Sequence, residues 1–366
     1  MKLLYFDLEF PYLIKNDGTP TGGAAVEWES WIEGFDNLGH DIQVLTWSGA
    51  HKFIGNNKKY KIVEGIDLKN GLPILKWFTH RFAKLYRAIS NTKPDVLIKE
   101  CANAYTGILA IIAKLLNIKF LYRVANDLDT DNRYKKKLSL FDRKLYEIGL
   151  ILSDYIVCQN QYQYNNLIKK FPKKKITILY NPIKNIKRDE KEELKKEYIA
   201  WIGIFQYQKN LPALLKIAET LPNITFKIAG KEDSGIDKKS LEALNKLKSL
   251  NNVNFVGFLK REKVKNFLKS SYLLLNTSHF EGFSNTFLEA WTVGVPVIST
   301  KNVNPDGLIT KFSLGIIAKN YYELPKIISD FISSNKYKSY EKKCYDYVQK
   351  NHDPNYLAQK FIFFIK

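Results

Sequence analysis

The 366-residue sequence has few cysteines, and the three that it contains, Cys101, Cys158 and Cys344, are far apart. This spacing indicates neither a disulfide framework nor a zinc cluster, and the five histidines show no metal-ligand spacing either. No apolar run approaches the ~18 residues needed to span a bilayer. Asp7 and Glu9 fall where a secretory signal peptide would need an apolar region. We therefore expect a cytoplasmic protein, or one held on the inner face of the cell membrane.

Arginine is also scarce, since only 7 of the 57 basic residues are arginine, although the formal net charge is +20. The abundance of Lys, Asn, Ile and Tyr fits an AT-rich coding bias, so much of this charge could be solvated surface. Residues 133–196, however, carry 17 basic and 7 acidic residues, and 17 − 7 gives a net charge of +10. Such a local excess can attract anionic lipid head groups or phosphorylated acceptors. Nucleic acid is not an expected partner, because the sequence has no helix-turn-helix, finger or RNP-type signature.

Segments with strand and helix periodicity alternate along the chain in two successive sets. The first set begins with a strand at 2–7 and ends with a strand at 177–179. A charged stretch over 184–196 is typical of a linker, and the second set then begins with a strand at 198–203. This order predicts an α/β protein with two doubly wound domains that face each other across a cleft. The expected divisions are an N-terminal domain over 1–183, a linker over 184–197 and a C-terminal domain over 198–350.

Gly and Pro residues indicate a long loop over 10–23, and apolar periodicity predicts one helix over 137–152. The apolar residues of that helix are Leu138, Phe141, Leu145, Ile148 and Leu152. This stripe could face the core of the first domain, with the neighbouring lysines simply solvated. The alternative is that Lys135–Lys137, with Arg133 and Lys173–Lys175, hold the protein against an anionic membrane.

The most specific pattern lies at 278–291, Ser-His-Phe-Glu-Gly-Phe-Ser-Asn-Thr-Phe-Leu-Glu-Ala-Trp. Glu281 and Glu289 stand eight positions apart. Glu281 follows an expected strand at 272–275, and Glu289 lies inside an expected helix at 286–293. Ser284 or Asn285 suits the helix N-cap, and the N-terminus of a helix favours bound phosphate. Carboxylates beside a phosphate site are good acceptors for sugar and ribose hydroxyls, so the pattern indicates nucleotide-sugar binding. Taken alone, the same spacing also occurs in strand–turn–helix segments without such a site.

This segment resembles the E-x7-E signature of glycosyltransferase family 4. Residues 201–210, Trp-Ile-Gly-Ile-Phe-Gln-Tyr-Gln-Lys-Asn, resemble the donor loop of that family, and 304–308 resemble a later loop. The resemblance implies the GT-B fold, with two Rossmann-like domains, and a last helix at about 354–366 that crosses back onto the first domain. It also implies a retaining, metal-independent glycosyltransferase that uses a UDP- or GDP-linked sugar and no other cofactor. The expected acceptor is a glycan or lipid-linked glycan, in cell-surface polysaccharide or lipopolysaccharide biosynthesis.

The resemblance further assigns roles to individual residues. Glu281 would hold the sugar hydroxyls and Glu289 the ribose, while Lys209 and backbone amides of 283–285 would stabilise the leaving diphosphate. The expected catalytic residues are Glu281, Lys209, Asn126 and Asp127. The expected donor-binding residues are Gly22, Gly23, Gly203, Lys209, Gly282, Phe283, Ser284, Asn285 and Glu289, and no metal site is expected.

Two positions depart from the family pattern. Ile204 stands where an arginine is usual, so Lys209 would neutralise the diphosphate largely alone. Asn126 stands where many members have a histidine, and an amide cannot take a proton. These departures leave open a non-catalytic subunit that binds a nucleotide sugar, and the charge alone leaves open a membrane adaptor. Asp127 and Asp129 have Asp-x-Asp spacing, but they lie in the opposite half of the chain from the expected donor site.

Overall fold

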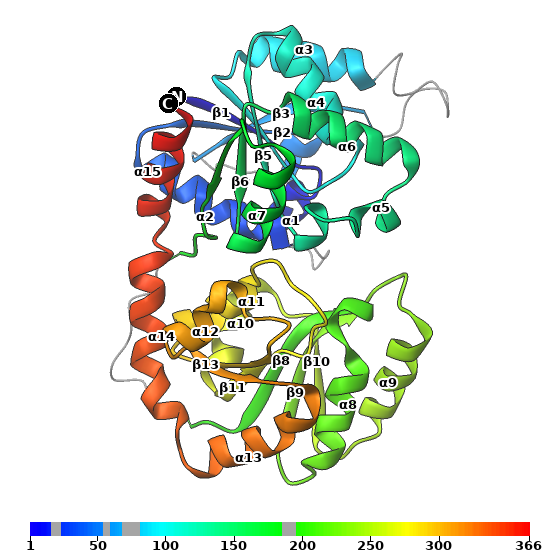
Figure 1. The fold of residues 1–366 in the computed structure, drawn as a ribbon, viewed down its shortest axis with the longest axis vertical. Helices are drawn as coiled ribbons and strands as arrows, with labels where there is room; N and C mark the ends of the chain where they lie inside the picture. Colours follow the sequence, from blue (N-terminus) through cyan, green and yellow to red (C-terminus); the bar gives the residue numbers. More distant parts are fainter. Residues whose placement is uncertain (16–22, 54–58, 68–80, 185–194) are drawn as a thin grey trace. The chain divides into compact units, whose positions relative to one another are not determined.

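The computed structural model describes residues 1–15, 23–53, 59–67, 81–184 and 195–366 (Figure 1). The chain forms two compact units, each built on a parallel sheet. Unit 1 contains residues 1–184 together with 354–366, and unit 2 contains residues 185–353. These two parallel-sheet units confirm the α/β fold class. Most of the expected linker, 185–194, lies outside the described residues.

The sheet of unit 1 has the strand order β3-β2-β1-β4-β5-β6-β7. Its strands are β1 Lys2–Phe6, β2 Asp41–Trp47, β3 Lys61–Ile66, β4 Val96–Glu100, β5 Lys119–Arg123, β6 Tyr155–Cys158 and β7 Lys175–Ile178. Its α-helices are α1 Phe10–Lys15, α2 Gly23–Asn37, α3 Phe82–Thr92, α4 Ala104–Leu115, α5 Tyr134–Lys137, α6 Leu140–Leu152, α7 Gln161–Lys170 and α15 Pro354–Ile365. Short 3-10 helices are η1 Ala50–Phe53 and η3 Asp127–Asp129.

The sheet of unit 2 has the strand order β10-β9-β8-β11-β12-β13. Its strands are β8 Tyr198–Phe205, β9 Phe226–Glu232, β10 Val253–Gly257, β11 Ser271–Leu275, β12 Val297–Thr300 and β13 Gly315–Ala318. Its α-helices are α8 Leu211–Thr220, α9 Lys238–Lys248, α10 Arg261–Lys269, α11 Asn285–Thr292, α12 Leu308–Lys311, α13 Leu324–Ser333 and α14 Tyr337–Asn351. Short 3-10 helices are η4 Tyr207–Lys209, η5 Pro305–Gly307 and η6 Tyr321–Glu323.

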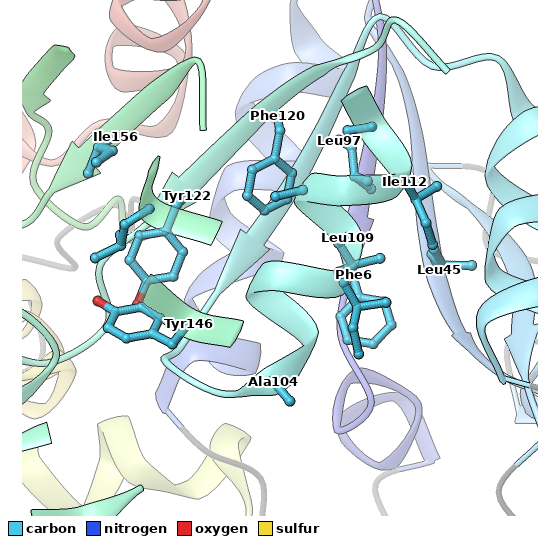
Figure 2. Close-up of a cluster of buried hydrophobic side chains, with 14 of the residues drawn as sticks. Phe6, Leu45, Leu97, Ala104, Leu109, Ile112, Phe120, Tyr122, Tyr146 and Ile156 are labelled. Carbon is cyan, nitrogen blue, oxygen red and sulfur yellow. The ribbon is translucent and has the colours of Figure 1, made fainter. Parts of the chain in front are cut away.

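The strands of unit 1 are apolar on both faces because helices cover both faces of the sheet. Successive side chains of a strand point to opposite faces, so the neighbours Tyr5 and Phe6 of β1 join different core clusters. Phe6 belongs to the cluster that includes Leu109 of α4 (Figure 2). Tyr5 belongs to the other cluster and stacks on Trp28 of α2, with ring centroids 3.8 Å apart.

Helix α15, at the end of the chain, packs against α2 and therefore belongs to unit 1. The ring of Phe361 contacts the rings of Trp31 and Phe35, with centroid distances of 5.4 and 5.2 Å. The hydroxyl of Tyr155 donates a hydrogen bond of 2.8 Å to the carbonyl of Ile365. These contacts fix the C-terminal helix on the α2 face of the sheet.

Two expectations for the first set of elements are wrong. The expected loop over 10–23 contains α1 at 10–15, and the expected single helix over 137–152 is two helices, α5 and α6. The break occurs because Leu138 is extended, with φ −93° and ψ 142°, and Ser139 caps α6 by accepting a hydrogen bond from the backbone N–H of Asp142. The residues of the expected apolar stripe also do not all face the core. Leu145 packs against the core, whereas Phe141 is exposed.

Helix α6 lies directly against α4 (Figure 1). At Gly107 of α4, an added Cβ would collide with the backbone carbonyl of Leu145, and at Gly149 of α6 it would lie 2.7 Å from the backbone of Thr106. The two glycines therefore permit a backbone approach that larger residues would prevent. Among the described residues, none of the helices has both the length and the apolar character that crossing a membrane requires.

This packing predicts that Gly107→Ala destabilises the protein. The new methyl group forces the two helices apart, and overpacking of this kind costs about 1–3 kcal/mol. Thermal unfolding of the full chain should show a lower first transition for this variant. Gly235→Ala is the matched control, because its added Cβ would meet its nearest neighbouring atom at an ordinary 3.7 Å. Equal transitions for Gly107→Ala and the wild type would contradict the packing argument.

Candidate functional site

The strand order of unit 2 reverses between β8 and β11, which are neighbours in the sheet. In open α/β sheets, ligands bind outside the carboxyl ends of the strands at such a point. Here β8 leads into η4 at 207–209, and β11 leads into a loop over 276–284 that ends at α11. The residues that the sequence singled out in unit 2 fall on these two loops and on α11.

Glu281 lies at the centre of a group of hydrogen bonds between the two loops. Its Oε1 accepts from the Nζ of Lys209 at 2.5 Å and from the hydroxyl of Ser278 at 2.7 Å. Its Oε2 accepts from the side-chain amide of Gln208 at 3.1 Å, and the same amide donates to the carbonyl of Phe280 at 3.0 Å. The carboxylate is therefore held by a cation and two neutral donors.

Further hydrogen bonds join the two loops through the backbone. The hydroxyl of Thr277 donates to the carbonyl of Lys209 at 2.8 Å, and the backbone N–H of His279 donates to the carbonyl of Gln208 at 2.8 Å. The indole of Trp201 donates to the hydroxyl of Thr277 at 3.0 Å. The loops thus form one fixed structure, and the ion pair has little freedom to move without them.

The backbone conformation around β8 and η4 explains why asparagine and glycine occur at positions 210 and 203. Asn210 adopts a left-handed conformation with φ 53°, and its side chain accepts from the backbone N–H of Ala213 at the start of α8. Asparagine tolerates this conformation better than most residues and is also a good N-cap. Gly203 leaves room for the Lys209 stem, because a Cβ there would lie 3.3 Å from the Cγ and Cδ of Lys209. Gly203 is therefore beside Lys209.

The turn before α11 contains Gly282, Phe283 and Ser284, and the helix begins at Asn285. The expected side-chain cap is not observed at Ser284, although Ser284 occupies the N-cap position. Its hydroxyl instead bonds to the hydroxyl of Thr286 at 2.9 Å, which explains why it does not cap the first turn. Helix α11 thus begins four residues after Glu281, and Ser284 makes no capping hydrogen bond to its first turn.

Glu289 lies half-buried on α11, which packs against α10. Burial raises the pKa of Glu289 to about 7, although Arg261 and Lys265 of α10 oppose this rise. The carboxyl of Glu289 is therefore about half ionised near neutral pH, unlike an ordinary glutamate. Arg261 and Lys265 supply positive charge to the same side of α11.

The candidate residues of unit 1 have structural partners of their own. The side chain of Asn126 accepts from the backbone N–H of Leu128 and so caps η3. Oδ1 of Asp127 accepts from the side-chain amides of Asn160 and Gln163, each at 2.9 Å, and burial raises its pKa. These bonds tie the loop after β5 to α7. Gly22 lies outside the described residues, and Gly23 is the exposed first residue of α2.

Unit 1 contains a buried charge cluster that the sequence did not predict. The Arg123 guanidinium at the end of β5 donates to Glu100 of β4 and contacts Glu27 of α2, each at 2.6 Å, and it donates to Asn181 at 2.8 Å. Burial raises the pKa of Glu27 to about 8, against the effect of Arg123. The three charged residues are far apart in sequence, so no spacing rule could have joined them. Gln208 and Ser278 were missed too, and their only signal is proximity in sequence to Lys209 and Glu281.

Two family models match the chain. The model described as Glycosyltransferase Family 4 matches residues 21–185, and the model described as Glycosyl transferases group 1 matches residues 182–350. Together they cover nearly the whole length, in the order of the two units. The chain is a family 4 glycosyltransferase.

Individual relatives agree with this assignment. The glycosyltransferase is 28% identical to the uncharacterised glycosyltransferase MJ1059 of Methanocaldococcus jannaschii, over 75% of this chain and 72% of that protein. It is 25% identical to the amylovoran biosynthesis glycosyltransferase AmsD of Erwinia amylovora, over 79% of this chain and 80% of that protein. The crystal structure of HepE from Anabaena in complex with UDP has the same fold, with a TM-score of 0.76, 16% identity, and coverage of 100% of this chain and 99% of that one.

These comparisons confirm the GT-B fold and the assignment to the transferase enzymes. In the glycosyltransferase, unit 2 supplies the hydrogen-bonded group around Glu281. The residues that it brings together are Gln208, Lys209, Ser278 and Glu281. Glu289 follows on α11, two turns further along the same segment.

Proposed function

We propose that this glycosyltransferase moves a sugar from a UDP- or GDP-linked donor to a glycan or lipid-linked glycan, with retention at the anomeric carbon. The observation that carries the proposal is the bonding of Glu281 to Lys209 at the carboxyl ends of β8 and β11. HepE, which shares the fold, was solved with UDP and with UDP-glucose, and this supports a nucleotide-sugar donor. The relative AmsD is an amylovoran biosynthesis glycosyltransferase, and this supports cell-surface polysaccharide or lipopolysaccharide biosynthesis as the setting.

In this proposal unit 2 binds the donor. The diphosphate lies between Lys209 and the N-terminus of α11, where a cation and a helix dipole both favour negative charge. Glu281 accepts hydrogen bonds from sugar hydroxyls, and Glu289 accepts them from the ribose. Gly203 and the turn at 282–285 allow the donor to approach the backbone closely. Unit 1 provides the acceptor side, where Asn126 and Asp127 shape the loop after β5, and Gly22 and Gly23 are proposed to approach the donor.

The proposed reaction breaks the bond between the anomeric carbon and the diphosphate, and the oxygen of the acceptor hydroxyl bonds to the same face of that carbon. The proton of that hydroxyl passes to the leaving diphosphate. Negative charge grows on the leaving diphosphate in the transition state. Lys209 is paired with Glu281, so the donor diphosphate must compete with this carboxylate for the cation. Fixed donors aimed at a developing charge stabilise a transition state most when they need no reorganisation. The hydrogen bonds that join the two loops supply this rigidity.

The two glutamates should fail in different ways. Glu281→Gln should lower turnover by about 10²- to 10³-fold, because the charge that orients Lys209 and the sugar hydroxyls is lost. Glu289→Ala should mainly weaken donor binding. Steady-state kinetics and donor titration would separate the two effects, with Glu219→Gln, on the exposed side of α8, as the control. Near-wild-type transfer by either variant would show that the assignment of that glutamate is wrong.

Donor binding should depend on pH through Glu289. The ionised carboxylate of Glu289 is the form that accepts hydrogen bonds from hydroxyls. Because the pKa of Glu289 is raised to about 7, this form is mostly lost by about pH 6 and mostly present by about pH 8. If only the ionised form binds well, affinity should rise about tenfold across this range. Calorimetric titration of the donor measures this. Glu289→Gln should bind weakly with little pH dependence, and a wild type without pH dependence would exclude the role.

Chelation should leave transfer intact. Lys209 and the N-terminus of α11 are proposed to stabilise the negative charge on the leaving diphosphate without a metal ion. EDTA should therefore change the transfer rate by less than about twofold, which is a small change in activation free energy. The measurement is donor turnover with and without EDTA. Complete loss of turnover, restored by magnesium or manganese, would overturn this mechanism and direct attention to Asp127 and Asp129.

A further inference from the structure

The outer face of α6 presents apolar side chains to solvent. The exposed fractions are 68% for Leu140, 48% for Phe141, 38% for Ile148 and 61% for Ile151. At the α-helical rotation of about 100° per residue, these side chains fall within an arc of about 100°, and exposed Lys144 lies inside it. We call these five residues the α6 face. A helix in a globular protein normally turns such a stripe toward the core, so an exposed one marks an interaction surface.

The α6 face is a fixed part of the fold. The opposite side of the helix carries buried Tyr146, whose hydroxyl donates to the carbonyl of Asp129 at 2.6 Å. Oδ1 of Asp142 accepts from the backbone N–H of Ala104 at 3.1 Å, which ties the first turn of α6 to the start of α4. The close approach of α4 at Gly107 and Gly149 adds a steric constraint. The helix cannot rotate to bury the α6 face without breaking these contacts.

Basic residues lie at both ends of α6. Lys135–Lys137 are exposed and form the end of α5, two residues before α6 begins. At its other end, the Nζ of Lys174 donates to the carbonyls of Ile151 and Ser153, at 2.8 and 2.6 Å, with exposed Lys173 and Lys175 beside it in the chain.

The nearby carboxylates already have partners within the fold. Oε1 of Glu147 accepts from the hydroxyl of Tyr134, and Asp142 bonds to Ser139. Lys114 and Lys119 share the single carboxylate of Asp154. The surrounding lysines outnumber these three carboxylates, so positive charge is in excess around the α6 face; the lysines are at 114, 119, 135–137, 144 and 173–175.

We propose that the α6 face docks the enzyme onto an anionic lipid bilayer, with its apolar side chains at the boundary between head groups and acyl chains. Charge complementarity selects this occupant, since lysines at both ends of the helix would meet lipid phosphates while the face between them enters an apolar layer. Nucleic acid would satisfy the lysines but leave the apolar side chains in water. This proposal rests on the proposed function in one respect: a lipid-linked acceptor at the membrane surface would be the reason for docking.

The test is sedimentation of the full-length protein with vesicles of phosphatidylcholine alone and of phosphatidylcholine mixed with phosphatidylglycerol. The wild type should bind the anionic vesicles and not the neutral ones, and binding should weaken as the salt concentration rises. The triple variant Lys135→Glu, Lys136→Glu, Lys137→Glu should lose at least about fivefold in partitioning per lysine replaced. The double variant Phe141→Ser, Ile151→Ser should lose at least about tenfold while keeping all of the charge.

Two control variants match these changes elsewhere on the surface. Phe363→Ser removes an apolar side chain that is 85% exposed on α15, and Lys246→Glu with Lys248→Glu reverses exposed charges on α9. Both controls should bind vesicles like the wild type. Thermal unfolding should confirm that all variants are folded, and donor titration should be unchanged in each. Donor titration therefore tests the proposed function separately from vesicle binding.

Several outcomes would overturn the proposal. They are an absence of vesicle binding at low salt, equal binding to neutral and anionic vesicles, and equal loss of binding in the α6 variants and the controls. Self-association that depends on Phe141 and Ile151, without vesicle binding, would instead identify the α6 face as a protein interface.

Discussion

The ion pair between Lys209 and Glu281 is the interaction on which the account of the site depends. It joins two loops that leave neighbouring strands, β8 and β11, at the point where the strand order of unit 2 reverses. Parallel strands place their carboxyl ends at one edge of the sheet, so residues 72 positions apart in sequence become neighbours. Gln208, Ser278 and Thr277 then hold the pair in place through hydrogen bonds. An arrangement of this kind is suited to a ligand that carries both phosphate and hydroxyl groups.

Unit 1 contains a second group of charges with a different character. Arg123, Glu27 and Glu100 are buried together, and removing charges from water is costly unless they are paired and hydrogen-bonded. The indoles of Trp28 and Trp31 supply the additional hydrogen bonds to the two carboxylates. This cluster links α2, β4 and β5, so it fixes the start of α2 close to the ends of the central strands.

Much of the fold could be predicted from the sequence, because continuous apolar strands and capped helices leave local patterns. The strands expected at 2–7 and 198–203 begin at the expected residues, as β1 Lys2–Phe6 and β8 Tyr198–Phe205. The helix break at Leu138 was missed, since apolar periodicity continues across it and only the Ser139 cap marks the new start. In the site, Glu281 and Lys209 were found from a motif. The partners of Asn126 and Asp127 and the Arg123 cluster depend on contacts between distant segments, which periodicity does not encode.

The central claim is that the edge formed by β8 and β11 binds a nucleoside diphosphate sugar. The most direct measurement is a thermal-shift screen of the purified full chain against UDP- and GDP-linked sugars, because a ligand that binds the folded state raises its stability by mass action. The account predicts that at least one of these donors raises the melting temperature, and that the shift is lost in Lys209→Ala. If no UDP- or GDP-linked sugar shifts the wild type, or if Lys209→Ala responds equally, the claim is contradicted.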